Sequence, residues 1–217
     1  MSIAPAVVSQ LRGLRSDSVV FVVDDDLSVR ESLELMILSA GWRAETCASA
    51  AAFLSTPPTS VPSCLILDLS LPDVGGLELQ KRMANDRPDL PIIFITGHAD
   101  VATSVRAMKA GAIEFLTKPF GHDELLSAID FALGRSRADL GRAEELRDIR
   151  DRYKSLSRRE REVMALVVSG RLNKQIGVEL RISEITLKAH RGKVMRKMQA
   201  ASLADLVRTA ERLRLPA

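Results

Sequence analysis

Short strand-like runs and segments of helical spacing alternate along the first 120 residues. Four runs are mainly apolar and one is more polar, and the strand candidates are residues 19–23, 43–47, 64–69, 91–96 and 113–117. Between them, apolar residues recur with helical spacing, which predicts helices at residues 27–40, 48–54, 77–83 and 101–110 and another from residue 123. Continuous apolar runs are typical of strands buried on both faces of a parallel sheet. The pattern therefore predicts a doubly wound, five-stranded parallel α/β sheet.

A long polar segment without proline follows. Over residues 124–153, Leu126, Leu133 and Leu140 are spaced by seven, as in a coiled-coil seam, but the repeat breaks at Arg147. Two interpretations stay open: a helix that pairs with its copy in a dimer, or a lone helix whose leucines rest on the first domain.

Helical signals also fill the end of the chain. Ser157 and Glu160 form a capping-box pattern, and the helix that they begin stops at Gly170. Further helices are expected at residues 172–180, 184–198 and about 202–213, and residues 181–183 form a tight connection. Two short helices joined by a tight turn, the second rich in Lys and Arg, predict a helix-turn-helix unit.

We therefore expect an N-terminal extension (residues 1–17), an α/β domain (18–134), a helical linker (135–153) and an all-α, four-helix helix-turn-helix domain (154–217). From residue 155 onward, 14 Lys and Arg stand against 6 Asp and Glu, a net of +8. The whole chain carries +3, so residues 1–154 carry −5. The basic domain indicates nucleic acid, with a solvated basic surface as the alternative. It has no aromatic residue, which disfavours stacking on single strands.

Several classes of protein are disfavoured by what the sequence lacks. No apolar stretch approaches the roughly 20 residues that span a bilayer, and the N-terminus is a poor signal peptide. Cys47 and Cys64 show no metal-ligand spacing, and we expect reduced core thiols. These features favour a cytoplasmic protein with no membrane partner.

Polar residues that could support chemistry follow the predicted strands at their carboxyl ends. They are Asp24 and Asp25 after the first strand, Asp68 in the third, Thr96 in the fourth and Lys118 after the fifth. Ligands of open α/β sheets bind at this edge. Three carboxylates placed together need a cation, and oxygen ligands suit Mg²⁺. A lysine and a hydroxyl beside that metal suit a phosphoryl group, which an Asp carboxylate could attack to form an acyl phosphate.

The strand-end residues also fit three alternative roles. Lys118 could pair with Asp68 only to satisfy a buried charge. The chain could be a Mg²⁺-dependent phosphatase with an Asp nucleophile, although such enzymes usually carry a second Asp where Ser70 stands. It could also be an interaction module whose basic domain binds RNA.

The strand-end residues resemble the receiver domain of bacterial two-component response regulators. The resemblance covers about residues 19–133 and is carried by Asp24-Asp25, Asp68, Thr96 and Lys118-Pro119, in that order. It implies that Asp68 accepts a phosphoryl group from a sensor histidine kinase. It also implies that Asp25, Asp68 and the main-chain carbonyl of Ser70 hold Mg²⁺, with Asp24 acting through a metal-bound water.

The same resemblance implies a switch. Thr96 would follow the phosphoryl group, and Phe115 would change rotamer, with a plain core role as the alternative for Phe115. Asp26 is expected to cap the first helix. His98 is expected to have a surface or loop role.

The end of the chain resembles the LuxR-type helix-turn-helix over about residues 153–212. The resemblance is carried by Leu156 to Val163, Asn173 to Ile176, Ile182-Ser183, Thr186, His190, Arg191, Val194, Lys197 and Met198. With the receiver, the chain resembles the FixJ/NarL class, nearest the FixJ branch. The implied recognition helix covers residues 184–198. The expected DNA-binding residues are Lys174, Thr186, Lys188, Ala189, Arg191, Gly192, Lys193 and Arg196.

These residues are expected to divide by role. Lys188, Ala189 and Gly192 share one helical face and would point at bases, and Lys188 could donate to guanine. The remaining basic residues would contact phosphates, with a solvated charge as the alternative for each.

We therefore expect a phosphorylation-dependent transcriptional regulator that uses Mg²⁺, not an enzyme. Its expected partners are a sensor histidine kinase, double-stranded promoter DNA, RNA polymerase and, on phosphorylation, a second copy that meets the face formed by residues 101–120. The family leans towards activation, but the sequence alone leaves activator or repressor, autoinhibition, the input signal, the kinase and the promoters open.

Overall fold

A computed structural model describes residues 17–97 and 100–214 of the chain. The expected N-terminal extension therefore lies almost wholly outside the described residues, as does His98. The described residues divide into two compact units, within Met1–Leu140 and Gly141–Ala217.

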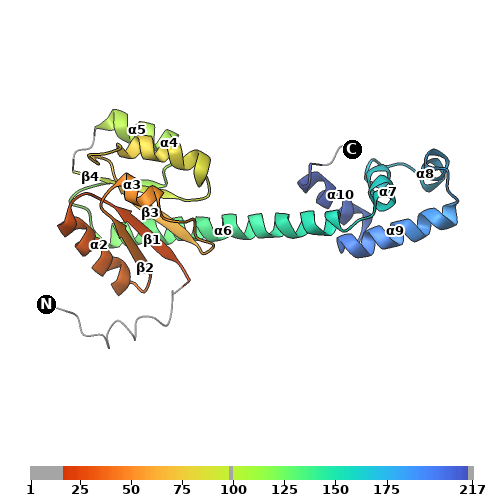
Figure 1. Cartoon of the computed structure of the whole chain (residues 1–217), viewed down its shortest axis with the longest axis horizontal. Helices are drawn as coiled ribbons and strands as arrows, with labels where there is room; N and C mark the ends of the chain where they lie inside the picture. Colours follow the sequence, from red (N-terminus) through yellow and green to blue (C-terminus); the bar gives the residue numbers. More distant parts are fainter. Residues whose placement is uncertain (1–16, 98–99, 215–217) are drawn as a thin grey trace. The chain divides into compact units, whose positions relative to one another are not determined.

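The first unit is built around a parallel sheet (Figure 1). Its described strands are β1 (Val19–Val23), β2 (Arg43–Cys47), β3 (Ser63–Asp68), β4 (Ile92–Thr96) and β5 (Glu114–Thr117). Their order is β2-β1-β3-β4-β5, and every pairing is parallel. The predicted doubly wound five-stranded sheet is thus confirmed.

Helices cover both faces of this sheet, as the alternation of strand side chains requires. One face packs against α2 (Leu27–Ser39) and the first part of α6 (His122–Lys154), through residues such as Val20, Ile66 and Ile129. The other packs against α3 (Ala50–Leu54), α4 (Gly76–Asp86) and α5 (Val101–Lys109), through residues such as Phe21, Leu67 and Met83. Both faces of β1 and β3 are buried, which explains their continuous apolar sequence.

Helix boundaries depend on local capping. The predicted N-cap at Asp26 is confirmed, because its side chain accepts hydrogen bonds from the backbone N–H of Ser28 and Val29. Helix α3 begins at Ala50, later than predicted, because Ser49 caps it by accepting from the N–H of Ala52. The periodic pattern also stops short of the true end of α4, which continues through polar residues to Asp86.

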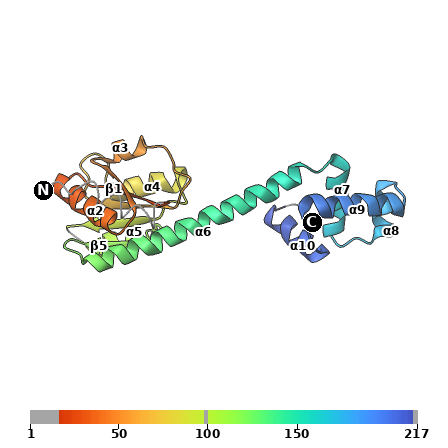
Figure 2. The ribbon, with the colours of Figure 1, turned by 90° about the horizontal axis from the view of Figure 1, so that it is seen from below.

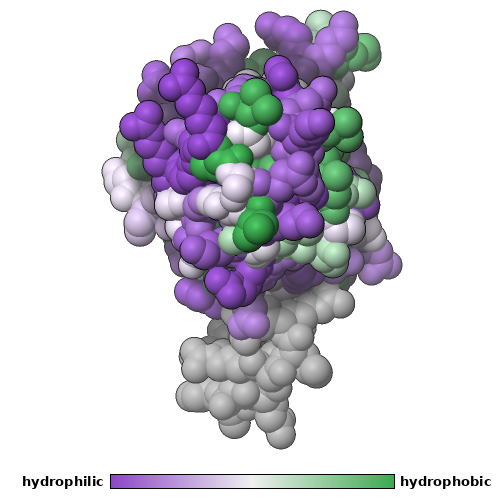
Figure 3. All heavy atoms as spheres, turned by 90° about the vertical axis from the view of Figure 1, so that its right-hand side faces the viewer, coloured by the Kyte–Doolittle hydropathy of each residue, from purple (hydrophilic) through white to green (hydrophobic). Residues whose placement is uncertain are grey.

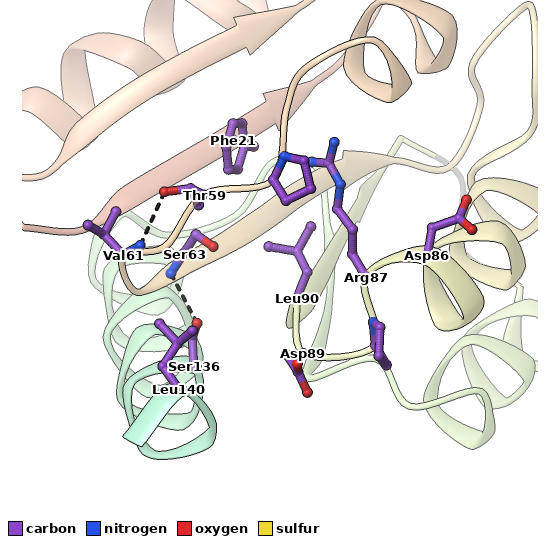
Figure 4. A pocket seen from close by; sticks show the side chains of 12 residues that line it. Phe21, Thr59, Val61, Ser63, Asp86, Arg87, Asp89, Leu90, Ser136 and Leu140 are labelled. Carbon is purple, nitrogen blue, oxygen red and sulfur yellow. Dashed lines mark hydrogen bonds between the residues drawn. The ribbon is translucent and has the colours of Figure 1, made fainter. Parts of the chain in front are cut away.

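Helix α6 is anchored to the amino-terminal edge of the sheet. The backbone N–H of Ser63 donates to Ser136 Oγ at 3.1 Å, and this contact borders a cavity of about 180 Å³ (Figure 4). The side chain of Leu140 also lines the cavity. Because Ser63 begins β3 and Asp68 ends it, this hollow lies at the opposite edge from the strand-end carboxylates.

The leucine repeat on α6 is used within the first unit. Leu133 belongs to the sheet core, Leu126 packs against that core, and Leu140 lines the cavity at the sheet edge. Figure 2 shows α6 as one unbroken helix past these leucines. This packing favours the interpretation in which the leucines rest on the first domain.

The second unit is helical, as predicted. It contains the end of α6, α7 (Arg158–Val168), α8 (Asn173–Leu180), α9 (Glu184–Met198) and α10 (Leu203–Arg212). Its core joins Ile149 and Leu156 to Val163, Leu187 and Leu206. Among the described residues, no helix is both long and apolar enough to cross a membrane.

Candidate functional site

The sheet order brings the strand-end residues together. Asp24 follows β1, Asp68 ends β3 and Lys118 follows β5. The ammonium group of Lys118 lies 2.6 Å from Asp24 Oδ2 and 3.0 Å from Asp68 Oδ1. One cation therefore bridges two carboxylates that stand 44 residues apart in the sequence, at the edge where ligands of such sheets bind.

Both carboxylates are buried and largely satisfied by hydrogen bonds. Asp24 is 1% exposed and Asp68 is 4% exposed. The second oxygen of Asp24 accepts from the N–H of Asp26 at 2.9 Å, and that of Asp68 accepts from the N–H of Ser70 at 2.9 Å. Burial alone would lower the pKa of Lys118, but hydrogen bonds to Asp24 and Asp68 outweigh it, so the pKa is raised. Lys118 is thus held in its charged form.

The donor chemistry of this edge fits a magnesium ion. Asp24, Asp25 and Asp68 supply hard carboxylate oxygens, the ligand type that Mg²⁺ prefers. Asp25 is exposed, in contrast to its two neighbours in the site. Among the described residues, no group of three or more acidic, His or Cys side chains is already gathered in a metal-binding arrangement. The fit therefore rests on the oxygen donors available and not on a preformed cage.

Arg30 supports the acidic loop and was not predicted. Its Nη1 donates to the carbonyl oxygen of Asp24 at 2.8 Å and to that of Asp25 at 2.9 Å. A single guanidinium on α2 thus fixes the backbone of two consecutive acidic residues. The position of Arg30 on the first turns of the helix after the acidic run was the only sequence signal for this contact.

The two expected switch residues lie on neighbouring strands. Thr96 is fully buried at the end of β4, and its carbonyl oxygen accepts from the N–H of Lys118 at 2.7 Å. Phe115 on β5 is half-buried, with its ring centroid 6.2 Å from that of Phe94. The Lys118–Pro119 peptide bond is cis.

The second unit contains the predicted helix-turn-helix. Helices α8 and α9 are joined by residues 181–183, in which Arg181 has a φ of 54°. A Cβ at Gly177 would lie 3.0 Å from the carbonyl oxygen of Ile182, so glycine lets the turn pack closely on α8. Ser183 caps α9 by accepting from the N–H of Thr186 at 3.2 Å.

Most of the expected DNA-binding residues are exposed. This group comprises Lys174, Thr186, Lys188, Ala189, Gly192, Lys193 and Arg196. Arg191 differs, because it is half-buried and donates a short hydrogen bond to the side chain of Asn173 at the start of α8. In this structure Arg191 links the two helices of the motif.

A partly buried ion pair links two helices of the second unit and was also missed. The capping box of α7 is confirmed, and Glu160 within it accepts from Lys197 Nζ at 2.7 Å. The hydrogen bond from Lys197, helped by the N–H of Ser157, lowers the pKa of Glu160 to about 2. The capping pattern identifies Glu160 in the sequence, but its partner is 37 residues away.

Comparison with known proteins identifies each unit. Residues 20–130 match the family described as "Response regulator receiver domain". Residues 154–210 match the family described as "Bacterial regulatory proteins, luxR family". This pair of matches is the domain combination expected from the sequence.

Similar proteins carry both units in one chain. The response regulator protein TmoT of Ectopseudomonas mendocina is 44% identical, with 91% of this chain and 90% of that protein covered. The transcriptional regulatory protein FixJ of Rhizobium meliloti is 42% identical over 90% of this chain and 96% of that protein. Both identities extend through the receiver and the DNA-binding unit.

Solved structures support the same assignment. A low-resolution structure of the response regulator StyR has a TM-score of 0.81 and 43% identity, and covers 91% of this chain and all of that one. Full-length FixJ from B. japonicum has a TM-score of 0.56 and 39% identity, over 93% of this chain and all of that one. Proteins that join a receiver to a LuxR-type DNA-binding domain, such as FixJ, regulate transcription and are not enzymes. The chain belongs to the FixJ/NarL class of two-component response regulators, which join a receiver domain to a LuxR-type DNA-binding domain.

Proposed function

We propose that Asp68 accepts a phosphoryl group from a sensor histidine kinase and that this controls binding of the second unit to promoter DNA. The observation that carries the proposal is the bridge from Lys118 to Asp24 and Asp68 across three strand ends. It supports the proposal because two carboxylates and a cation lie together at one sheet edge, as attack by Asp68 on phosphorus would need.

The proposed reaction forms an acyl phosphate. A carboxylate oxygen of Asp68 attacks phosphorus as the bond between phosphorus and the kinase imidazole breaks, and the imidazole nitrogen leaves with the electron pair. Lys118, charged and hydrogen-bonded to Asp68, stabilises negative charge on the transferring oxygens. Mg²⁺ would add positive charge there, held by Asp25, Asp68 and the Ser70 carbonyl, and by Asp24 through a water.

The proposed response runs through β4 and β5. Thr96 would bond the new phosphoryl group and Phe115 would turn inward, which reshapes α5 beside them. That helix already exposes apolar side chains, with Val101 at 80%, Val105 at 44% and Met108 at 42%. We propose this face, within residues 101–120, as the contact between two copies after phosphorylation.

The proposed output is binding of two helix-turn-helix units to one duplex. Lys188, Ala189 and Gly192 would face the bases, while Thr186 and the exposed basic residues Lys174, Lys193 and Arg196 would position the helix on phosphates. The half-buried Arg191 would reach a phosphate while it holds α8. We further propose contact with RNA polymerase, an activating role, and a place in the cytoplasm, where kinase and promoter meet.

Intact-mass measurement tests the receiver chemistry. Full-length wild type and Asp68→Asn are incubated with Mg²⁺ and acetyl phosphate. The proposal expects one added phosphoryl group on wild type and none on the variant. A stoichiometric adduct on Asp68→Asn would overturn the assignment of Asp68, whereas no adduct on either protein would mean a kinase-only or an unphosphorylated mode of control.

A further inference from the structure

Helix α9 has one face that the core leaves open. The face of α9 that packs on the core of the second unit is defined by the buried side chains of Leu187, Val194 and Met198. Residues 185, 188, 189 and 192 are spaced i, i+3, i+4 and i+7, so they share a face. Ile185 is 82% exposed there, the largest exposed fraction among the large apolar side chains described.

The position of Ile185 along α9 indicates which part of a DNA duplex its exposed side chain could contact. It lies in the first turn of α9, two residues after the cap at Ser183. In a helix-turn-helix, the N-terminal residues of the second helix contact base edges in the major groove. Ile185 is therefore at the end of α9 that enters the groove.

The residues that share this face with Ile185 leave room for DNA bases to approach the helix closely. Ala189 carries only a methyl group, and a Cβ at Gly192 would meet nothing within 4 Å. Lys188 on the same face and Lys193 beside it are exposed and positively charged, which attracts the phosphate backbone on either side. The face thus offers one bulky apolar side chain with small residues behind it and cations beside it.

The major groove offers one apolar group of matching chemistry, the C5-methyl group of thymine. We infer that Ile185 is a specificity-determining residue that packs against a thymine methyl and selects thymine at one position for each bound unit. Lys188, one turn further along, donates to a neighbouring base. The inference deepens the proposed function, since it rests on duplex binding by α9.

Exposure alone does not distinguish Ile185, because single exposed apolar side chains are common on proteins. In Figure 3, the green hydrophobic side chains near the centre of the view are surrounded by white and purple ones, while others adjoin along the right-hand edge. Val178 on α8 is 75% exposed but belongs to the first helix of the motif. It therefore serves as a matched control: an aliphatic side chain of similar exposure away from the base-facing side of α9.

A methyl-deletion experiment tests the inference. Full-length wild type, treated with acetyl phosphate and Mg²⁺, selects its preferred duplex from a randomised library. Each thymine of that duplex is then replaced by deoxyuridine, which removes the methyl group and preserves pairing. Affinity is measured by fluorescence anisotropy for wild type, Ile185→Ala and Val178→Ala.

The expected result is a coupling between one side chain and one methyl group. Deoxyuridine at one contacted thymine position, which removes the methyl contact of one bound unit, should weaken wild-type binding about fourfold, the value of one buried methyl-sized group. Ile185→Ala removes the contact in both units, so it should weaken binding to the thymine duplex about 16-fold and be insensitive to deoxyuridine at that position. Val178→Ala should keep the wild-type sensitivity.

Two results would overturn the inference while duplex binding stands. Wild type could bind the selected duplex with no thymine position sensitive to methyl loss, or Ile185→Ala could retain the full sensitivity. If wild type enriched no duplex at all, the proposed function would fail together with the inference. Circular dichroism of both variants checks folding, which such exposed positions should leave unchanged.

Discussion

The substitution Glu160→Gln tests how the second unit is held together. Glu160 is 4% exposed, and its Oε2 accepts from Lys197 Nζ at 2.7 Å and from the N–H of Ser157 at 2.8 Å. The pair joins the start of α7 to the last turn of α9. Glutamine keeps an oxygen that can accept from Ser157 but removes the negative charge that Lys197 faces.

The expected loss of folding stability in Glu160→Gln follows from the pKa of Glu160. Its interactions, led by the hydrogen bond from Lys197, lower that pKa from 4.5 to about 2. At about 1.4 kcal/mol for each pKa unit, lowering the pKa by about 2.5 corresponds to at most ~3.5 kcal/mol of stability. The Lys197 side chain is 35% exposed, so solvent screening reduces the figure to ~2 kcal/mol.

The loss of stability caused by Glu160→Gln should become smaller as the pH falls. A carboxyl group with a lowered folded-state pKa stabilises the fold above its unfolded pKa, here 4.5. This contribution disappears as pH falls from 4.5 towards 2. The difference between wild type and Glu160→Gln should therefore be full at pH 7 and shrink to roughly 40% of that value by pH 3.

Urea unfolding of the full chain can separate the two units. The single tryptophan, Trp42, is buried in the first unit and reports only on that unit by fluorescence, while far-UV circular dichroism reports on both. With a slope of ~1 kcal/mol/M for a small unit, the midpoint of the second unit should fall by ~2 M urea at pH 7. The Trp42 transition should stay where it is.

The more exposed Glu162 provides the control. Its partners Arg158 and Arg159 lie on the same helix, so Glu162→Gln should leave the midpoint almost unchanged. Equal midpoints for Glu160→Gln and wild type at pH 7 would show that the pair with Lys197 does not stabilise the second unit. A difference that persisted undiminished at pH 3 would show that the charge of Glu160 is not its source.

Three further predictions concern other parts of the chain. Gly76→Ala should destabilise the first unit by ~1–3 kcal/mol in unfolding followed by Trp fluorescence, because the added Cβ would lie 2.7 Å from the carbonyl oxygen of Asp68. Gly75→Ala is the control and should leave the stability unchanged, because a Cβ there would meet no atom within 4 Å. Arg30→Ala should raise the Mg²⁺ concentration needed for half-maximal phosphorylation several-fold, and an unchanged requirement in a rate titration would count against its support of the acidic loop. Lys188→Ala should weaken binding to the selected duplex more than to random DNA in anisotropy titrations, whereas equal loss would make it a phosphate contact.

Local and periodic features of the fold could be predicted from the sequence. The run at β1 is buried on both faces, so its continuous apolar sequence identifies it directly. The capping box at Ser157 and Glu160 lies within four residues and needs no knowledge of the fold. The meeting of Asp24, Asp68 and Lys118 could also be inferred, because parallel strands bring their carboxyl ends to one edge.

Contacts that depend on packing between distant helices could not be predicted. The partner of Glu160 is set by how α7 packs on α9, and no local pattern marks Lys197 as that partner. The same holds for Arg191, which the sequence pattern assigns to DNA phosphates and which the structure bonds to Asn173. A seven-residue leucine repeat shows that Leu133 meets an apolar surface but not whether a second helix or the sheet provides it.

Control of DNA binding by phosphorylation is tested most directly by DNA affinity before and after the reaction. Full-length wild type and Asp68→Asn are titrated against the selected duplex, with Mg²⁺ and with or without acetyl phosphate. We predict that acetyl phosphate tightens binding of wild type and leaves Asp68→Asn unchanged. Equal affinity of wild type under both conditions, or the same tightening in Asp68→Asn, would contradict control of DNA binding through Asp68.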